Sequence, residues 1–433
     1  MPGGLLQLIN KGDMDQYITG NPEISLFKSV YRRTTNFAII SKKLDIENDM
    51  GYGKVRTFNI DRDGDLLSKM YFNLTNDELL HYPSNFGHYL IDYIELSIGG
   101  QIISKLYGHW MEVWSRLSEQ NTNRQPLEMS DYMIPKMNLQ HLNYTKYQQM
   151  TCACGIKGTN ENENDKIKLG NIQIPLPFWF CRNIGLALPL IALQYDVVSL
   201  KVKFSDKLNL PNELALEYFN FELWVDYVLL DTEERRRFAQ VSHEYLIEQV
   251  QVNDFDVKYG MNNLTLKYYH PVKELIFALD WNRVMDNNSW CEIGTIPSMG
   301  HDIMLSFNIN GNSVYHKDRI INFFSRKEIW EKHSGIGNIY EGHNNLHGEG
   351  YIDYCEGFNA GNLPTHGDSI LVSSFSIKPE DYQPTGTMNF SAINDVSVIL
   401  NKLKIKNKTL KVYAVNYNIL KIISGMGKLL YVN

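Results

Sequence analysis

The chain contains one pair of histidines with the spacing of a metal site. His343 and His347 lie four residues apart, and Glu349 and Cys355 follow closely. On a helix this spacing would place both imidazoles on one face, where they could bind zinc. The segment is rich in glycine, which disfavours a helix. We therefore interpret these as surface histidines in a loop, and we predict that the chain binds no metal and uses no cofactor.

Other catalytic motifs are incomplete in this sequence. His243 and Glu244 open a zinc-protease pattern, but Ile247 occupies the place of its second histidine. The stretch GMGK at 425–428 lacks the length and the hydroxyl residue of a phosphate-binding loop, so we predict a turn there. The sequence has no G-x-S-x-G turn for a nucleophilic serine, and no His-x-His pair of the kind found in metal-binding cupins. The sequence thus gives no support to an enzyme.

Charge and cysteine content restrict the partners and the compartment. The 433 residues include 42 Lys and Arg against 49 Asp and Glu, a net charge of -7, so we predict no specific nucleic-acid partner. Five cysteines, an odd number, indicate reduced thiols rather than a disulfide framework. The apolar runs are too short for a signal peptide or for a span across a bilayer. We expect a soluble protein that is not secreted by this route.

Several asparagines begin an N-x-[ST] triplet and are therefore candidate glycosylation sites. A chain without a signal peptide would not ordinarily meet the secretory glycosylation machinery. Chance matches in an Asn-rich sequence are therefore the simpler interpretation. The candidates are Asn73, Asn143, Asn263, Asn287, Asn389 and Asn407.

The elements that position these residues are organised around the stretch from Phe221 to Gln251. Apolar and polar side chains alternate from Phe221 to Leu229, which predicts a strand with one buried face that closes a sheet. Asp231 can then cap a short helix, with Glu234 placed to complete the cap. A second β-rich run begins with VSHEYLIEQVQV. The short helix is therefore interpreted as a hinge between two β domains.

Turn and breaker residues predict the local structure of the first half. YLIDYIELSI and QIISKLYG are joined by Gly99 and Gly100, a turn that favours a hairpin. We expect another hairpin where KVRTFNI and LLSKMYFNL flank DRDGD, with Gly64 in the turn. The spacing of apolar residues after His109 predicts a short helix at the edge of the sheets. Prolines and a glycine between 172 and 193 predict a core segment that folds back on itself.

The second half repeats short β runs separated by turn residues, which favours a sandwich or a barrel. We expect long loops at 121–171 and 334–368, where strand-forming residues are sparse. The predicted boundaries are an N-terminal arm at 1–26, a first domain at 27–231, a hinge at 232–242, and a second domain with a C-terminal tail at 243–433.

Six stretches resemble sequence landmarks of the major capsid proteins of large icosahedral double-stranded DNA viruses of eukaryotes, such as phycodnaviruses, mimivirus relatives and iridoviruses. The resemblance runs in order over almost the whole chain. Ala392 stands where the family motif has an arginine, which affects only a local contact. The stretches are TGNPEISLFKSVYRRTTNFAI (19–39), LSIGGQIISKLYGHWMEVW (96–114), IPLPFWFCRNIGLALPLIALQYDVV (174–198), LLDTEERRRFAQVSHEYLIEQVQ (229–251), QPTGTMNFSAIN (383–394) and YAVNYNILKIISGMG (413–427).

The resemblance implies an all-β double jelly roll: two eight-stranded antiparallel β-sandwiches in tandem, with short helices and long loops. It implies a structural role, in which homotrimers form pseudo-hexagonal capsomers that tile the icosahedral shell of a virion assembled in the host cytoplasm. The implied partners are further copies of the chain, neighbouring capsomers, and minor capsid and penton proteins. The arm would lie beneath the shell, towards the internal viral membrane. Outer loops in this family often carry glycans, which strengthens the case for the Asn triplets.

Two alternatives stay open from the sequence. A capsid-like paralogue could act as a carbohydrate-binding or receptor-binding β-sandwich module at a vertex or fibre. The second alternative is a jelly-roll enzyme, which a bound metal in the purified protein would favour. Copy number in purified particles separates a shell subunit from an accessory module.

Overall fold

The computed structural model describes residues 12–44, 51–75, 85–119, 146–151, 171–206, 220–282, 292–294, 296–297, 303–314, 319–335, 367–368, 370–403 and 408–432. These residues belong to two units, Met1–Phe37 and Ala38–Asn433. The first unit is an arm that consists of helix α2 (Asp13–Thr19) and an irregular segment. Every described arm residue is exposed, including Phe27 and Tyr31. The arm therefore has no core of its own.

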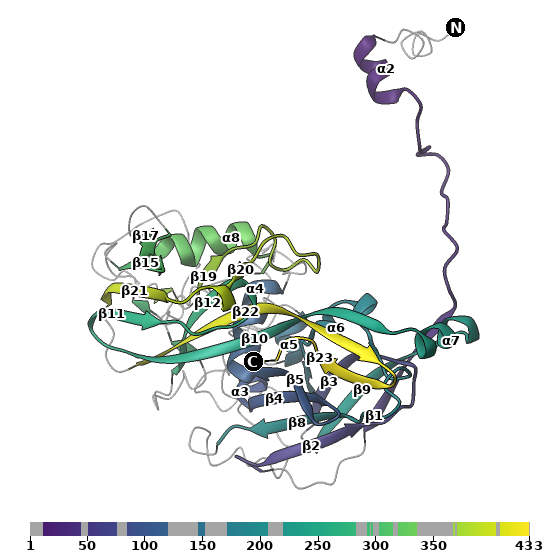
Figure 1. The fold of residues 1–433 in the computed structure, drawn as a ribbon, viewed down its shortest axis with the longest axis horizontal. Helices are drawn as coiled ribbons and strands as arrows, with labels where there is room; N and C mark the ends of the chain where they lie inside the picture. The colour runs from purple at the N-terminus through teal and green to yellow at the C-terminus, as the bar shows by residue number, and fades with distance from the viewer. Residues whose placement is uncertain are drawn as a thin grey trace, which may run out of the picture. The chain divides into compact units, whose positions relative to one another are not determined.

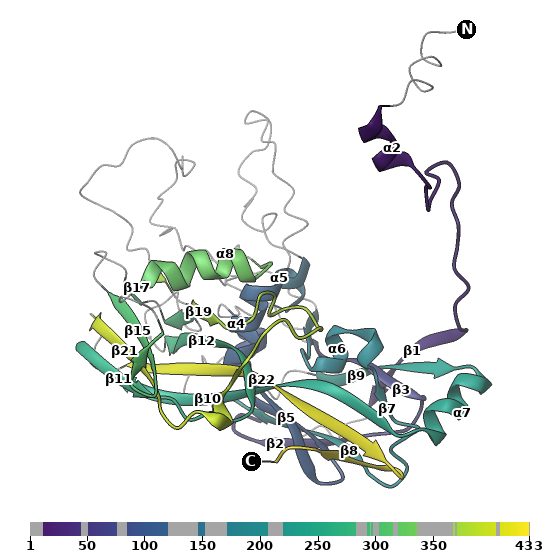
Figure 2. The same cartoon turned by 45° about the horizontal axis from the view of Figure 1, so that its top comes forward.

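The second unit begins with an antiparallel β-sandwich (Figures 1 and 2). One layer, sheet A, has the strand order β1-β9-β3-β6, with the short β7 also paired to β3. The facing layer, sheet B, has the order β2-β8-β4-β5. The strands are β1 (Phe37–Leu44), β2 (Val55–Ile60), β3 (Leu66–Thr75), β4 (Ile91–Ile98), β5 (Gln101–Tyr107), β6 (Asn171–Pro175), β7 (Leu188–Pro189), β8 (Val198–Phe204) and β9 (Asn220–Leu230).

A second sandwich repeats this connectivity. Sheet C has the order β10-β22-β12, and β12 also pairs with β13, β19 and β20, while β23 pairs with β22. Sheet D has the order β11-β21-β15-β16, with β17 also paired to β15. A two-stranded sheet joins β14 and β18. The strands are β10 (His243–Val257), β11 (Gly260–Thr265), β12 (Pro271–Asn282), β13 (Glu292–Gly294), β14 (Ile296–Pro297), β15 (Met304–Ile309), β16 (Asn312–Ser313), β17 (Arg319–Ile320), β18 (Gly367–Asp368), β19 (Ile370–Ser374), β20 (Met388–Asn389), β21 (Val396–Leu403), β22 (Lys408–Ile423) and β23 (Met426–Leu429).

In each sandwich the last long strand lies between the first and the third strands of that sandwich: β9 between β1 and β3, and β22 between β10 and β12. This order defines a jelly roll, so the chain is an all-β double jelly roll, as predicted. Its helices are short: α3 (Phe86–Tyr89), α4 (Gly108–Ser118), α5 (Lys146–Thr151), α6 (Trp179–Arg182), η3 (Ile184–Leu186), α7 (Thr232–Gln240), the π-helix η6 (Phe323–Lys327), α8 (Glu328–Lys332) and η7 (Phe390–Ala392). Among the described residues, none of these helices has the length and apolar character to cross a bilayer.

Helix α7 confirms the predicted cap between the two sandwiches. The side chain of Asp231 accepts a hydrogen bond from the backbone N–H of Glu234 at 2.9 Å. Glu233 pairs with Arg236 one turn later, at 3.6 Å. No residue of the helix is buried. The helix is anchored at its edge, where Phe238 packs against the small cluster of Leu66, Ala187 and Val228 and Arg235 pairs with Asp65 at 3.0 Å.

The β4–β5 hairpin also follows the prediction. Ile98 pairs with Gln101 across the turn, and Gly99 and Gly100 have φ of 57° and 84°. Both angles lie in the left-handed region, which suits glycine. A Cβ at Gly99 would in addition lie 2.6 Å from a carboxylate oxygen of Asp196.

The predicted hairpin across DRDGD is wrong. Strand β2 pairs with β8 in sheet B, whereas β3 pairs with β9 in sheet A. The connection therefore crosses from one layer to the other. Gly64 is needed for close packing, because a Cβ there would lie 2.5 Å from the Cβ of Tyr227. The Tyr227 hydroxyl donates to the carbonyl of Asp61 at 2.9 Å, which fixes this crossing.

Strand β9 closes sheet A from a central position, because it lies between β1 and β3. Its apolar side chains are buried from Phe221 to Tyr227 as predicted, but Val228 is also buried and Leu229 is exposed. Val228 packs with Leu66 and Ala187 in a small separate cluster. The alternation therefore ends at Tyr227, two residues earlier than expected.

Sheet C differs from the other sheets because both of its faces are buried. Along β12, Leu275, Phe277 and Leu279 belong to the core between sheets C and D. The intervening Ile276 and Ala278 belong to the core that extends through the first sandwich. Since successive side chains of a strand point to opposite faces, sheet C is packed against sheet D on one side and against the first sandwich on the other.

Replacing Gly100 by valine should destabilise the protein by about 1 to 3 kcal/mol, because a β-branched residue is strained at positive φ. Urea unfolding of the variant measures this loss. Thr57→Val is the matched control, since Thr57 is exposed on a strand of the same sheet. An unchanged midpoint for Gly100→Val would contradict a glycine-dependent turn.

Ending the chain at Thr409 should give insoluble protein. The cut removes β22 from Leu410 onwards, which opens its ladders with β10 and β12 and strips both buried faces of sheet C. That loss exceeds a typical total stability of about 5 to 15 kcal/mol. A chain without Val432 and Asn433 keeps β22 and should stay soluble. Soluble, cooperatively folding protein from the longer truncation would show that β22 is dispensable.

Candidate functional site: the junction between the sandwiches

Helix α4 is the element that joins the two sandwiches. It follows β5 directly, and all its residues from Gly108 to Leu117 are buried. The expectation of a helix at the sheet edge is therefore wrong. The predicted apolar side chains Trp110, Val113, Trp114 and Leu117 are buried, but so are the polar ones between them. The reason is that the helix is covered on both sides: Trp110 and Trp114 meet residues of the second sandwich, while Glu112 and Arg116 are buried in the first.

The polar residues of α4 are paired within the first sandwich. Glu112 is fully buried, and its carboxylate lies 2.7 Å from Nδ1 of His88 and 2.7 Å from Nε of Arg116. A buried charge is tolerated when it is paired and hydrogen-bonded. These contacts allow a helix with charged residues to be covered on every side.

His109 connects α4 directly to sheet C. Its Nε2 lies 2.9 Å from the carbonyl oxygen of Leu279, and its Nδ1 lies 2.8 Å from the hydroxyl of Tyr413. A carbonyl only accepts, so Nε2–H donates to Leu279 and Nδ1 accepts from Tyr413. Burial lowers the pKa of His109 to about 4, which keeps the ring neutral as this pattern requires.

A charge cluster surrounds Trp114 on the other side of the helix. Glu248 of β10 binds Arg182 and Lys273, each at 2.6 Å. Both cations lie over the Trp114 ring, with Arg182 at 5.0 Å and Lys273 at 5.9 Å from its centroid. Burial would raise the pKa of Glu248, but Arg182 and Lys273 lower it overall, so the carboxylate is ionised. Lys273 has no exposed side-chain surface and also donates to the carbonyl of Pro379.

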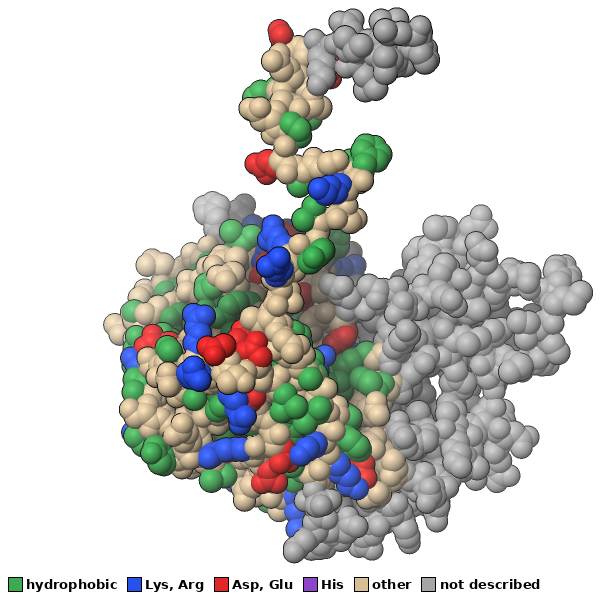
Figure 3. Space-filling model, turned by 90° about the vertical axis from the view of Figure 1, so that its right-hand side faces the viewer, with side chains coloured by type: hydrophobic (Ala, Val, Ile, Leu, Met, Phe, Trp, Pro, Cys, Tyr) green, Lys and Arg blue, Asp and Glu red, His purple; other side chains and the backbone are tan. Residues whose placement is uncertain are grey.

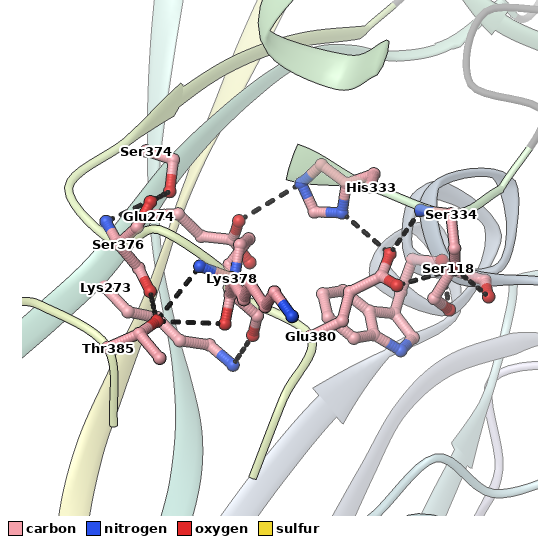
Figure 4. A network of polar contacts seen from close by, with 12 residues as sticks. Ser118, Lys273, Glu274, His333, Ser334, Ser374, Ser376, Lys378, Glu380 and Thr385 are labelled. Atoms are coloured by element: carbon pink, nitrogen blue, oxygen red, sulfur yellow. Dashed lines mark hydrogen bonds and ion pairs between the residues drawn. The ribbon is translucent and has the colours of Figure 1, made fainter. Parts of the chain in front are cut away.

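His333 completes this cluster (Figure 4). Its Nε2 lies 3.2 Å from Glu274 and its Nδ1 lies 3.0 Å from Glu380, and the ring edge faces Trp114. Burial by itself would lower the pKa of His333, but the two carboxylates raise it to about 9. The ring is therefore an imidazolium at neutral pH. Three cations (Arg182, Lys273 and His333) then balance three carboxylates (Glu248, Glu274 and Glu380) around one tryptophan.

The residues after His333 bind the C-terminal end of α4. The backbone N–H of Gly335 donates to the carbonyl of Leu117 at 2.7 Å, and a Cβ at Gly335 would lie 2.4 Å from that oxygen. The hydroxyl of Ser334 lies 3.2 Å from the carbonyl of Ser118 and 2.6 Å from Glu380 (Figure 4). The second sandwich therefore supplies hydrogen bonds that the last turn of α4 cannot make internally.

The C-terminal hairpin forms the third contact of the junction. The turn at Ser424 and Gly425 joins β22 to β23, so the turn predicted for 425–428 is present at its first residue, while Met426 to Lys428 lie in β23. The N–H of Gly427 donates to Asp196 at 2.7 Å, and Gly425 accepts from the N–H of Tyr195 at 3.1 Å. A Cβ at Gly425 would lie 2.6 Å from the Tyr195 ring. Glycine is thus required here for close packing on the first sandwich.

These groups are suited to joining two domains and show no catalytic arrangement. Within the described ranges, no group of three or more His, Cys, Asp or Glu residues could hold a metal ion. Cys181 is partly buried, and desolvation raises the pKa of its thiol to about 12, so it is a poor nucleophile at neutral pH. A cavity of about 800 Å³ borders the junction, lined by Trp114, Arg182, Glu380 and the outer face of sheet A.

The predicted site residues are dispersed rather than brought together. Asn73 lies in β3, is 9% exposed, and its amide donates to Glu222 at 3.2 Å. Asn263 in β11 and Asn389 in β20 are exposed. The other predicted residues lie outside the described parts of the chain: Asn143, Asn287, Asn407, His343, His347, Glu349 and Cys355.

Sequence reasoning missed the junction residues. Lys273 and Glu274 interrupt an otherwise apolar strand, which is a signal of buried, paired charge that the sequence does contain. His109 and His333 carry no local signal, because their partners lie more than 40 residues away in the chain.

Known proteins match this chain over its whole length. Residues 25–231 match the family model for the major capsid protein N-terminus, and residues 234–428 match that for the large eukaryotic DNA virus major capsid protein. The chain is 35% identical to the major capsid protein of Pyramimonas orientalis virus and 30% identical to that of Paramecium bursaria Chlorella virus 1, with 100% of each chain covered in both cases.

Solved structures show the same architecture. A quasi-atomic model of the PBCV-1 virus capsid superposes with a TM-score of 0.71 at 26% identity, covering 94% of this chain and 100% of that one. The Faustovirus major capsid protein has a TM-score of 0.60 at 12% identity over 96% of this chain, which supports the fold.

The fold and its junction define a double jelly-roll capsid protein. This chain belongs to the family of major capsid proteins of large eukaryotic DNA viruses. Its role is structural, within the capsid of the virion, and this is favoured over an accessory binding module. A structural capsid identity implies a protein that is not an enzyme.

The charge cluster predicts a loss of stability at alkaline pH. The folded-state pKa of His333 is about 9 against an ordinary 6.5, so its contribution is complete below pH 6.5 and is lost as the pH rises to about 9. The shift corresponds to about 3 kcal/mol. Urea unfolding between pH 6 and 10 measures this decline, which His333→Gln should flatten. His243→Gln, outside the junction, should retain it. Equal slopes for the His333 variant and the wild type would contradict the assignment.

Proposed function

We propose that three copies of this chain form a homotrimer and that these trimers tile the shell as pseudo-hexagonal capsomers. The main support for this proposal is that a single chain contains the same jelly-roll connectivity twice. Two similar blocks per chain give six in a trimer, so a threefold assembly acquires a nearly sixfold outline. The relatives are named major capsid proteins, which supports a repeating shell subunit.

The remaining assignments extend this proposal. We propose the domain boundaries 27–231 and 243–433, with residues 232–242 as the hinge between them. The expected partners are neighbouring capsomers and minor capsid and penton proteins, with assembly in the host cytoplasm. Asn263 and Asn389 are the described candidates for glycosylation, because their side chains are exposed. Asn73 is a poor candidate, since its amide is buried against Glu222.

The N-terminal arm, residues 1–26, is proposed to contact components beneath the shell, namely minor capsid proteins and the internal viral membrane. Two observations support a binding role. Its described apolar side chains are all more than half exposed, including Ile24 and Leu26. Apolar side chains are spread along the surface of the arm, and the basic residues Lys28, Arg32 and Arg33 follow it before β1 (Figure 3). Such a segment gains order mainly from what it touches.

Native mass spectrometry of the purified protein tests the trimer. The expected mass is about 150 kDa, three times 50.2 kDa. A folded monomer at micromolar concentration would refute the homotrimer.

Deleting Pro2 to Thr19 should leave a soluble trimer with a near-normal melting temperature, because no described arm residue in this span is buried. The same variant should assemble poorly into closed shells. Calorimetry and electron microscopy of assembly reactions measure the two effects. Loss of the trimer would instead place the arm in the subunit interface.

A further inference from the structure

Helix α4 is held to the second sandwich by two histidines that need opposite charge states. His109 is the second residue of the helix, and its ring bonds both β12 and β22. His333 faces Trp114 further along the helix and lies between Glu274 and Glu380, where an imidazolium is required. Acid therefore favours the second contact and opposes the first.

The hydrogen bonds of His109 fit only the neutral ring. Its Nε2–H donates to the carbonyl of Leu279 at 2.9 Å, while its Nδ1 accepts from the hydroxyl of Tyr413 at 2.8 Å. A proton on Nδ1 would face the hydroxyl hydrogen, so the hydroxyl would have to turn away. Tyr413 is fully buried, and among the described residues its hydroxyl has no other hydrogen-bond partner. Protonation would thus leave a buried donor without an acceptor, which disfavours the closed junction.

Aromatic side chains of the second sandwich enclose the ring of His109. The Tyr413 ring lies nearly parallel to it, with 5.8 Å between the centroids, and Trp281 meets it edge-on at 5.1 Å. Only 4% of His109 is exposed. Burial disfavours the charged form of an imidazole, and it is the main cause that lowers the pKa of His109 to about 4.

The charged groups nearest to His109 act on it from a distance. Asp280 of β12 and Glu112 of α4 favour the imidazolium, whereas Lys411 of β22 opposes it. Asp280 accepts from the backbone N–H of Trp281 at 2.9 Å and lies 3.9 Å from Lys411. Glu112 is bound on the other side of the helix. Among the described residues, no carboxylate therefore pairs directly with the ring of His109 to offset its burial.

A cavity of about 210 Å³ lies beside the ring of His109, between the two sandwiches. A space of this size and polarity can hold water. Two carboxylates of its wall are half-exposed: Asp92, which binds Lys203 at 2.7 Å, and Asp254, which binds Lys411 at 3.1 Å. Protons can thus reach Nδ1 without prior unfolding. The other titratable groups that line the cavity are Asp206, Asp280, Tyr89, Tyr107 and Tyr413.

We propose that His109 is an acid-sensitive latch between the two sandwiches: a proton on its Nδ1 displaces the hydroxyl of Tyr413 and weakens the contact of α4 with sheet C. At neutral pH the latch is closed, because the neutral ring bonds β12 and β22 at once. In acid the ring is charged within an enclosed aromatic site, and the two halves of the subunit are joined less firmly. The latch lies within a single chain, so it does not depend on the proposed trimer.

The sign of the pH effect follows from the direction of the shift. The folded-state pKa of His109 lies below the ordinary 6.5, so its contribution to stability is complete above pH 6.5 and is lost as the pH falls towards 4. Between pH 7.5 and 5, His109 alone should raise the unfolding constant about thirtyfold. His333 acts in the opposite direction over this interval, because its folded-state pKa is about 9. The contribution of His109 must therefore be measured against a variant.

Urea unfolding of the full-length protein and of His109→Gln, at equal protein concentration and at pH 7.5 and 5, tests the latch. Glutamine keeps a side-chain N–H for the carbonyl of Leu279 but does not titrate in this range. The ratio of the wild-type to the variant unfolding constant should rise about thirtyfold on acidification, because the effects of all other residues cancel in it. The control is His243→Gln, whose ring binds the carbonyl of Phe238 outside the junction, and its ratio should change far less. A constant ratio for His109→Gln would overturn the latch.

A second measurement uses the wild-type protein and does not depend on the folding of a variant. Deuterium exchange at the imidazole Cε1 of each histidine, followed by mass spectrometry across a pH series, reports the titration of that ring. His109 should stay neutral until the pH approaches about 4, whereas His333 should already be charged at neutral pH. A His109 ring that titrates at its ordinary pKa of 6.5 would overturn the latch, because folding would then not oppose its protonation.

Discussion

The structure depends on the burial of sheet C on both faces. An antiparallel sheet usually packs one face on a core and leaves the other in water. Here the side chains of β12 enter two cores alternately, with Phe277 facing sheet D and Ile276 facing the first sandwich. Helix α4 is the element that makes this possible, because it presents His109, Trp110 and Trp114 to sheet C while its other side remains in its own sandwich. The core of the first sandwich therefore extends to one face of sheet C, while a second core lies between sheets C and D.

Electrostatics at this junction follow from the same burial. Charged groups taken out of water must be paired, and the junction pairs them around Trp114, with one pair between the sandwiches and the others within the second. His109 and His333 take opposite protonation states, since burial lowers the pKa of the first and two carboxylates raise that of the second. Arg182 of the first sandwich binds Glu248 of the second. Specific pairing of this kind fixes one relative arrangement of the two blocks, which an apolar contact alone would define less uniquely.

Local signals in the sequence predicted much of the fold. Gly99 and Gly100 specify a turn by their backbone freedom, and Asp231 specifies a helix start by its capping oxygen. Contacts between distant segments were the source of the errors. Gly64 looked like a turn residue, but it is required by the ring of Tyr227, and α4 looked like an edge helix because nothing in its own sequence indicates that sheet C covers it. The family resemblance predicted the architecture and the structural role. The junction residues could be identified only from the fold, which places β10, β12 and α4 next to one another.

The central claim is that the two sandwiches form one cooperative unit through α4 and sheet C. Native-state hydrogen exchange in increasing denaturant tests it most directly, by comparing the amides of α4 with those of β12. The account predicts that both sets of amides open with the same free energy and the same denaturant dependence. Independent opening, in which α4 exchanges through a lower-energy step while β12 stays protected, would contradict it.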